Sequence, residues 1–157
     1  MIREIVAVIV ICLMITDMKA QNTSCDISVT TMISLFDLEL SKSDIEKKLN
    51  CYSYFGIKGM AQFRVFLVDY QMNDSNYYDK LEIPISNEKS PKHYITFETS
   101  NYQTYTSSRE RFLKFGFELI NSVEKASVYS HKGLEIQTMA FYEIGRYIIV
   151  LRKGDKG

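Results

Sequence analysis

The two histidines are the chain's first candidates for catalysis or for binding a metal ion. His93 and His131 lie far apart in the sequence, and neither belongs to an H-x-x-x-H pattern or a C-x-x-C set. Zinc sites usually draw two ligands from such a closely spaced pair. We therefore expect no metal site, and nothing else in the sequence indicates a cofactor.

Glutamates and serines are the other residues able to do chemistry. Four glutamates lie in segments that alternate apolar and polar residues: Glu82, Glu98, Glu118 and Glu135. Alternation points them to solvent, although two of them could converge for acid–base work. Ser107 and Ser108 lie outside any G-x-S-x-G pattern and are typical of a helix start. The sequence has no P-loop and no dinucleotide-binding glycine motif, so it assigns no catalytic residue.

The most distinctive polar segment is QMNDSNYYDK, residues 71–80. Short polar side chains beside two tyrosines are typical of recognition loops, because tyrosine offers contact area at low entropic cost. A hairpin turn whose tyrosines flank the two strands is the simpler interpretation. If the segment binds a partner, its candidate residues are Asn73, Asn76, Tyr77 and Tyr78.

A helix is expected to end at Gly116. In NYQTYTSSRERFLKF, residues 101–115, the apolar side chains recur at helical spacing. Ser100 or Asn101 can cap its start, and Gly116 supplies the left-handed residue that ends many helices. The alternation in FELI then predicts a strand. The aromatic stripe of this helix most simply packs in the core; the alternative is a sugar- or lipid-binding groove lined by Tyr102, Tyr105 and Tyr129.

An earlier segment, residues 41–60, repeats this pattern. Ser41 and Asp44 form a capping pair ahead of a second apolar helix face. The Phe-Gly-Ile step at Gly56 mirrors the Phe-Gly-Phe step at Gly116, sixty residues later. We therefore expect Gly56 to be a second helix-stop glycine and the chain to contain two related units.

The remaining segments are expected to be strands. They are residues 61–70, 79–86, 92–99, 117–125, 126–132, 134–143 and 146–153. The last is apolar on both faces, which indicates a central strand, and a short turn at Ile144-Gly145 precedes it. Pro84 is expected at an edge or a strand end.

Few helices and consecutive strands predict one α+β domain over residues 35–153. We expect an antiparallel sheet with two main helices on one face. The related α-β-β-β units would cover about 35–90 and 91–153.

The first 20 residues are typical of a signal peptide. The apolar run at 5–15 is too short to span a bilayer, and Ala20 offers a small residue before the expected cut. The competing interpretations are an uncleaved anchor and a short buried segment. Export predicts a periplasmic or secreted protein with no stable transmembrane span after cleavage. Residues 21–34 would be an N-terminal extension, and 154–157 a frayed tail.

Cleavage after Ala20 leaves Cys25 and Cys51. Cys12 lies in the apolar run behind Ile11, where a lipoprotein signal would need a small residue. Cysteines of exported proteins often pair, and a Cys25–Cys51 bond would stabilise the fold by about 3–4 kcal/mol in the chain-entropy model. Two free thiols are the alternative, because sequence cannot show the geometry of the pair.

The formal net charge is zero, with 19 basic and 19 acidic side chains, so nucleic-acid binding has little electrostatic support.

The chain resembles small exported proteins of Gram-negative bacteria. The resemblance lies in a leader ending in KAQ, a helix ending in FLKFGFELI, and the later segments ASVYSHKG and RYIIVLRKG. The tandem units are also similar to the β-lactamase-inhibitor-protein-like architecture. The resemblance covers most of residues 35–153. It implies export and a fold, and it supplies no activity and no catalytic residues.

The sequence thus predicts an exported, non-catalytic binding domain that recognises a protein or an envelope component such as a glycan. It would bind through its loops and the open face of its sheet. The alternative is a small secreted hydrolase with an unrecognised carboxylate or serine site. An enzyme predicts a concave pocket with converging glutamates or histidines, whereas a binding module predicts an exposed aromatic patch.

Overall fold

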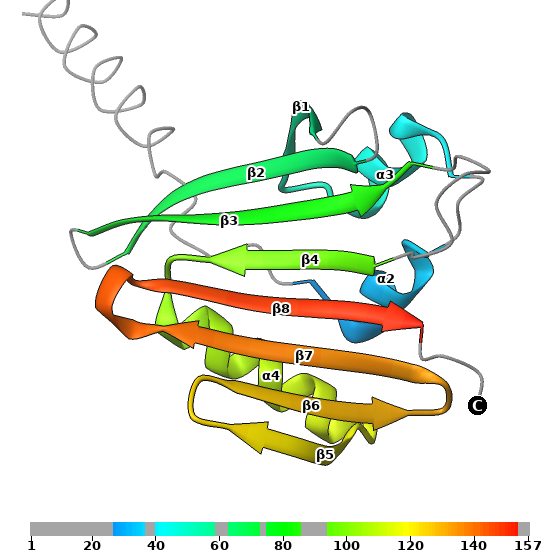
Figure 1. Ribbon diagram of the computed structural model, residues 1–157. Coiled ribbons are helices and arrows are strands. Elements are labelled where there is room, and N and C mark those ends of the chain that lie inside the picture. The colour runs from blue at the N-terminus through cyan, green and yellow to red at the C-terminus, as the bar shows by residue number, and fades with distance from the viewer. Residues whose placement is uncertain (1–26, 37–39, 59–62, 73–74, 86–93, 154–157) are drawn as a thin grey trace, which may run out of the picture.

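An eight-stranded antiparallel sheet dominates the computed structural model (Figure 1). The structure describes residues 27–36, 40–58, 63–72, 75–85 and 94–153. Within these ranges three α-helices and one 3-10 turn accompany the strands, which confirms the α+β class.

The helices are α2 (Val29–Ser34), α3 (Lys42–Lys48) and α4 (Tyr102–Phe115), and the 3-10 turn is η1 (Tyr142–Ile144). The strands are β1 (Ser53–Lys58), β2 (Phe63–Met72), β3 (Ser75–Pro84), β4 (Tyr94–Thr99), β5 (Glu118–Val123), β6 (Ala126–His131), β7 (Leu134–Phe141) and β8 (Arg146–Lys153). Their order in the sheet is β1-β2-β3-β4-β8-β7-β6-β5. β8 is therefore a central strand, as predicted, and β1 and β5 are the edges. Pro84 is the last residue of β3, which confirms the expected strand end.

Helix α4 has the predicted ends. The Asn101 side chain accepts hydrogen bonds from the backbone N–H groups of Gln103 and Thr104. Gly116 ends the helix in the left-handed conformation, with φ 108°, and β5 begins two residues later. Ser107 and Ser108 lie inside this helix rather than at its start, and Ser107 Oγ donates to the Thr104 carbonyl at 3.1 Å. Their interpretation as helix-start residues is wrong, because Asn101 already caps α4.

Helix α3 begins as predicted but ends earlier. Ser41 and Asp44 form a capping box, and the helix stops at Lys48. Gly56 lies in β1, where the register with β2 shifts between Tyr54 and Gly56. The prediction that Gly56 stops a helix is therefore wrong. The sequence comparison placed Gly56 sixty residues before Gly116, which ends α4. Because α3 has only 7 residues and α4 has 14, α3 has already ended when the chain reaches Gly56, and Gly56 lies in the strand that follows.

Helix α2 was not predicted from the sequence. Ser28 caps it by accepting a hydrogen bond from the backbone N–H of Thr31 at 3.0 Å. Val29 and Met32 are buried in the same core as the sheet. The folded domain therefore begins before residue 35, inside the segment predicted to be an N-terminal extension.

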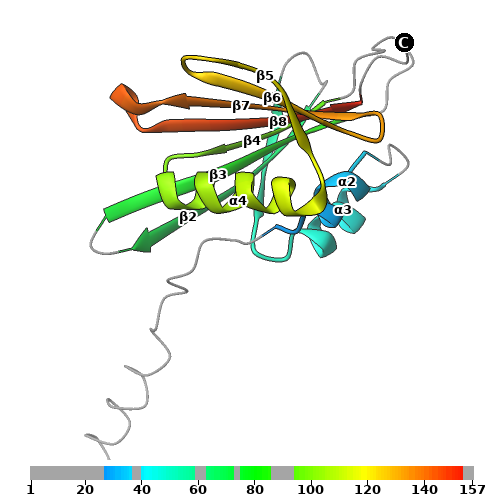
Figure 2. The same cartoon turned by 90° about the horizontal axis from the view of Figure 1, so that it is seen from below.

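One face of the sheet supplies most of the core. Leu81 of β3, Phe97 of β4 and Ile149 of β8 lie opposite one another in register and are buried. Tyr105 and Phe112 of α4 belong to the same cluster, and Figure 2 shows α4 running alongside the sheet. Because side chains alternate along a strand, the residues between these point to the opposite side, here called the outer face.

Candidate functional site

The segment predicted as a recognition loop is the tip of the β2–β3 hairpin. The two strands pair without a break from Phe63–Pro84 to Met72–Ser75. Tyr77 and Tyr78 thus lie in β3, opposite Tyr70 and Asp69 of β2. Tyr77 and Tyr78 therefore belong to a paired strand of a hairpin, as the simpler interpretation of this segment predicted, and not to a recognition loop.

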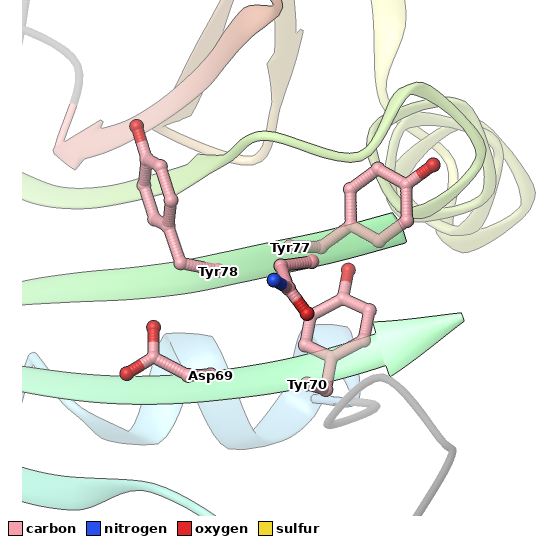
Figure 3. Close-up of a pocket in the computed structure, with 5 residues that line it drawn as sticks. Asp69, Tyr70, Tyr77 and Tyr78 are labelled. Carbon is pink, nitrogen blue, oxygen red and sulfur yellow. The ribbon is translucent and has the colours of Figure 1, made fainter. Parts of the chain in front are cut away.

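A pocket of about 480 Å³ lies at this tip (Figure 3). We call it the hairpin pocket; its lining residues are Asp69, Tyr70, Asn76, Tyr77 and Tyr78. Three of the four predicted binding residues come together there, while Asn73 lies outside the described residues. Asp69 and Tyr70 were missed. The register of β2 with β3 sets Tyr70 opposite Tyr77 and Asp69 opposite Tyr78, so a hairpin register is the signal that could have found them.

Two tyrosines of the hairpin pocket are held by hydrogen bonds of their hydroxyl groups, and the third stacks on one of them. The rings of Tyr70 and Tyr77 stack with their centroids 5.8 Å apart and their planes 28° apart. The Tyr70 hydroxyl lies 3.1 Å from Thr104 Oγ1 in the first turn of α4. The Tyr78 hydroxyl donates to Glu98 Oε1 at 2.8 Å. These bonds fix the rings before any ligand arrives, which lowers the entropic cost of binding.

Glu98 anchors a charged network on the outer face. Its Oε2 lies 2.8 Å from both Lys80 Nζ and Arg146 NH2, while Oε1 accepts from Tyr78. Burial would raise the pKa of the Glu98 carboxyl, but the hydrogen bonds from Arg146, Lys80 and Tyr78 outweigh burial and lower the pKa to about 2. Glu98 is therefore ionised at neutral pH and serves as a structural anchor.

The four glutamates of the sequence analysis do not share one environment. Glu82 and Glu98 are only 8% and 5% exposed, so the expectation that they are solvated is wrong. Lys80 lies between them and pairs with both carboxylates. Glu135 is half-buried and accepts two hydrogen bonds from Arg152, whereas Glu118 is exposed on β5. Side chains of neighbouring strands cover Glu82 and Glu98, and the alternation within one strand cannot reveal such contacts.

A buried carboxyl lies behind the hairpin pocket. Asp79 is fully buried, and Tyr70 donates to its Oδ1 at 3.3 Å. Burial raises the pKa of Asp79 to about 6, against the hydrogen bonds from Thr99 and Tyr70, which lower it. Its Oδ2 and the buried Tyr52 hydroxyl have no hydrogen-bond partner within the described ranges. Asp79 was not predicted from the sequence, although it lies two residues before the buried Leu81 and so points to the same face of β3.

A second aromatic cluster borders the hairpin. Tyr102 of α4 lies 5.9 Å from Tyr142 of η1 and 5.4 Å from Tyr147 of β8, between ring centroids. Tyr102 and Tyr142 are exposed, whereas Tyr105 and Tyr129 are buried in the core. The alternative of a groove lined by Tyr102, Tyr105 and Tyr129 is therefore wrong, because two of its three residues face the core, as the simpler interpretation of core packing predicted.

His131 has a structural setting, and His93 lies outside the described residues. The His131 Nδ1 atom lies 2.9 Å from the Gly116 carbonyl oxygen, and its ring contacts Phe115 and Phe117. Cys51 is disulfide-bonded. The other cysteines, at positions 12 and 25, lie outside the described residues, so pairing with Cys25 stays a prediction.

In the described part of the chain no cluster of histidine, cysteine, aspartate and glutamate could hold a metal ion. None of its helices is long and apolar enough to span a bilayer. No protein-family model, curated protein or solved structure matches this chain.

Proposed function

We propose that the protein is an exported binding domain, with no catalytic site of its own, that recognises a protein or an envelope component through the hairpin pocket. The observation that carries the proposal is the lining of this pocket by three tyrosines, an asparagine and an aspartate. Tyrosine with small polar residues suits recognition, because a rigid ring gives contact area while short side chains adapt their hydrogen bonds.

The hydrolase alternative has less support at this pocket. Its five lining residues include no histidine, serine or cysteine, so they supply no nucleophile paired with a base. Asp79 has the raised pKa expected of a general acid or base, but it is fully buried behind Tyr70. A substrate in the hairpin pocket would meet the Tyr70 ring instead of the Asp79 carboxyl.

Export is part of the same proposal. The apolar run at 5–15 and Ala20 are typical of a cleaved leader, which would place the mature chain in the periplasm or outside the cell. The disulfide at Cys51 supports this, because such bonds persist mainly in oxidising compartments. The pattern resemblance to small exported Gram-negative proteins points the same way.

We also infer that the helices cover one face of the sheet and that the chain contains two related units. Buried residues of all three helices and of the inward face of the strands form a single cluster, which favours the first inference. For the second, α3 is followed by β1–β4 and α4 by β5–β8, and the two meanders join where β4 pairs with β8. Each unit would then hold four strands after its helix, one more than the α-β-β-β unit predicted from the sequence.

Affinity capture tests the proposed binding function. The tagged mature chain, residues 21–157, would be crosslinked mildly in its native envelope, and captured material read by mass spectrometry and glycan analysis. We expect one dominant partner, with crosslinks at the β2–β3 tip, and loss of capture in Tyr77→Ala.

The matched control for this experiment is Phe55→Ala. Phe55 is an aromatic residue that is 74% exposed on the edge strand β1, outside the pocket lining. It should leave capture unchanged. If Tyr77→Ala captures the same partner as the wild type from an equally folded sample, the hairpin pocket is not the recognition site.

A further inference from the structure

The β2–β3 hairpin extends beyond the strands on either side of it. β1 pairs with β2 only as far as Leu67, and β4 pairs with β3 only from Asp79 to Glu82. The backbone of Ser100 still bonds to Tyr78, next to Asp79. Residues 70–72 and 75–77 form the rest of the hairpin, here called the projecting tip, and Figure 1 shows it running past β1 and β4. Asp79 therefore lies close to the point where β3 leaves the sheet.

The projecting tip is attached to α4 through Tyr70. The Tyr70 hydroxyl lies 3.1 Å from Thr104 Oγ1, in the first turn of the helix, and 3.3 Å from Asp79 Oδ1. Figure 2 shows that the hairpin tip and the start of α4 lie at the same end of the sheet. Because one hydroxyl contacts both groups, a motion that separates the projecting tip from α4 also uncovers the Asp79 carboxyl.

The Asp79 carboxyl has no counter-charge. It is fully buried, and it forms no ion pair with another described residue. Its Oδ2 has no hydrogen-bond partner in the described part of the chain, so this oxygen is the one that takes up a proton. A carboxylate in such surroundings lacks the water and the cations that would stabilise its charge. Ionisation therefore favours any state in which water reaches Asp79.

The side chains that face Asp79 stay neutral between pH 4 and pH 8. Tyr70 of β2 and Tyr52, which follows α3, are its titratable neighbours, and burial raises the pKa of both hydroxyls. β4 presents the uncharged Thr99, and the α4 cap Asn101 faces the Tyr70 hydroxyl. Burial raises the pKa of the Asp79 carboxyl to about 6, so Asp79 alone in this group changes its charge in that interval.

We propose that Asp79 is a pH-sensitive switch that favours release of the projecting tip from α4 when it ionises. On opening, the Tyr70 hydroxyl leaves Thr104 and water reaches the carboxyl, which has lost one proton to solvent. The protonated acid keeps the tip attached. The closed form remains the main one, and pH changes how often the tip opens. The inference holds whether or not the hairpin pocket binds a partner.

Hydrogen exchange resolved by NMR measures the opening of the projecting tip. Amide protection factors of the mature chain, residues 21–157, would be corrected for the intrinsic exchange rate at each pH. An exposed Asp79 has its ordinary pKa of 3.8 and the buried one a pKa of about 6, so protection of the tip should fall about tenfold from pH 5 to pH 7. Local opening of the β5–β6 hairpin, at the far edge of the sheet, should show no such change.

Three variants complete the test. Asp79→Asn cannot ionise, so protection of the tip should be the same at pH 5 and pH 7. Thr104→Val keeps the branched shape but removes the hydroxyl that Tyr70 contacts, so it should lower protection of the tip about two- to tenfold at both pH values. The matched control is Thr106→Val, because the Thr106 hydroxyl donates to carbonyl oxygens within α4. It should leave the tip unchanged, and far-UV circular dichroism would check that all three variants fold.

Three results would overturn the proposal. Equal protection of the tip at pH 5 and pH 7 in the wild type would mean that opening does not uncover Asp79. The same pH dependence in Asp79→Asn would mean that another group causes it. Unchanged protection in Thr104→Val would mean that the contact of Tyr70 with α4 does not hold the tip. Partner capture is not a readout here, so each of these results leaves the proposed binding function as it stands.

Discussion

Replacing the buried Asp79 by asparagine should stabilise the protein at neutral pH. Asp79 is fully buried, and burial raises its pKa from the ordinary 3.8 to about 6. A pKa unit corresponds to 1.36 kcal/mol, so keeping this carboxyl ionised in the fold costs about 3 kcal/mol. Asparagine has nearly the same shape and no charge, so it avoids this cost.

The sign of the pH dependence follows from the raised pKa. Between about pH 4 and pH 6 the folded chain holds a proton on Asp79 that the unfolded chain has released. The Asp79 contribution to the free energy of unfolding therefore falls as pH rises through this interval and is lowest above it. Below pH 4 both states are protonated and the cost disappears.

The assay is urea unfolding of the wild type and Asp79→Asn at several values between pH 4 and pH 8. The difference in the free energy of unfolding should grow in favour of the variant by about 2–3 kcal/mol across that range. The new amide N–H groups need an acceptor inside the fold, and Tyr52 offers a hydroxyl without a partner in the described chain. A poor hydrogen bond at that position would change the free energy of unfolding of the variant by the same amount at every pH, so the pH dependence of the difference would remain.

Tyr70→Phe provides a second check on the same carboxyl. The Tyr70 hydroxyl donates to Asp79 Oδ1 and lowers the pKa of Asp79, so its removal should raise that pKa further. The interval over which stability falls should then move to higher pH. A difference between wild type and Asp79→Asn that stays constant from pH 4 to pH 8 would refute the reasoning, because it would mean that folding leaves the titration of Asp79 unchanged.

Two substitutions and one gel test other parts of the fold. Glu98→Gln should lower the free energy of unfolding by about 2 kcal/mol at pH 7. Because the pKa of Glu98 is lowered to about 2, this loss should shrink as the pH falls from 4.5 towards 2, and equal losses at pH 7 and pH 2 would contradict it. Gly116→Ala should cost at least about 1–2 kcal/mol in urea unfolding, since φ is 108° and a Cβ would lie 3.1 Å from the His131 ring; an unchanged midpoint would count against this geometry. The mature chain should run faster on a denaturing gel without reductant than with it, through a Cys25–Cys51 bond, and two alkylatable thiols without reduction would contradict the bond.

The sequence was informative where one segment determines its own structure. Helix α4 ends at Gly116 as predicted, since a left-handed cap depends on local backbone conformation. The strands after α4 were also predicted, because alternation and short turns are local signals. Gly56 was misassigned because a Phe-Gly step fits a bulged strand as well as a helix end, and only pairing with β2 distinguishes them.

Helix α2 and the burial of the carboxylates could not be predicted from local sequence signals. α2 has only 6 residues, too few for a helical period to emerge, and it is held by packing of Val29 and Met32 in the core. Glu98 looks solvated from its own strand, but it is covered by Arg146, which comes from a strand 48 residues further along the chain. Such burial depends on contacts between distant segments.

The gathering of tyrosines follows from the topology of the sheet. In an antiparallel sheet, alternate connections lie at the same end. The tip of β2–β3, the start of α4 and the turn η1 therefore meet at one end, as Figure 1 shows. Pairing of Thr99 in β4 with Tyr147 in β8 joins the two meanders there, and this pairing is the long-range contact that the sequence does not reveal.

This placement explains why the candidate site lies at that end. The core cluster fixes the strands, while Tyr70 connects the hairpin to α4 through Thr104, and Tyr78 connects it to β8 through Glu98 and Arg146. Both connections join the pocket to rigid elements, so its rings are positioned by the fold rather than by a loop. A ligand at the hairpin pocket would therefore bind a preformed surface, and its affinity should depend on the lining side chains that the fold holds in place, such as Tyr77.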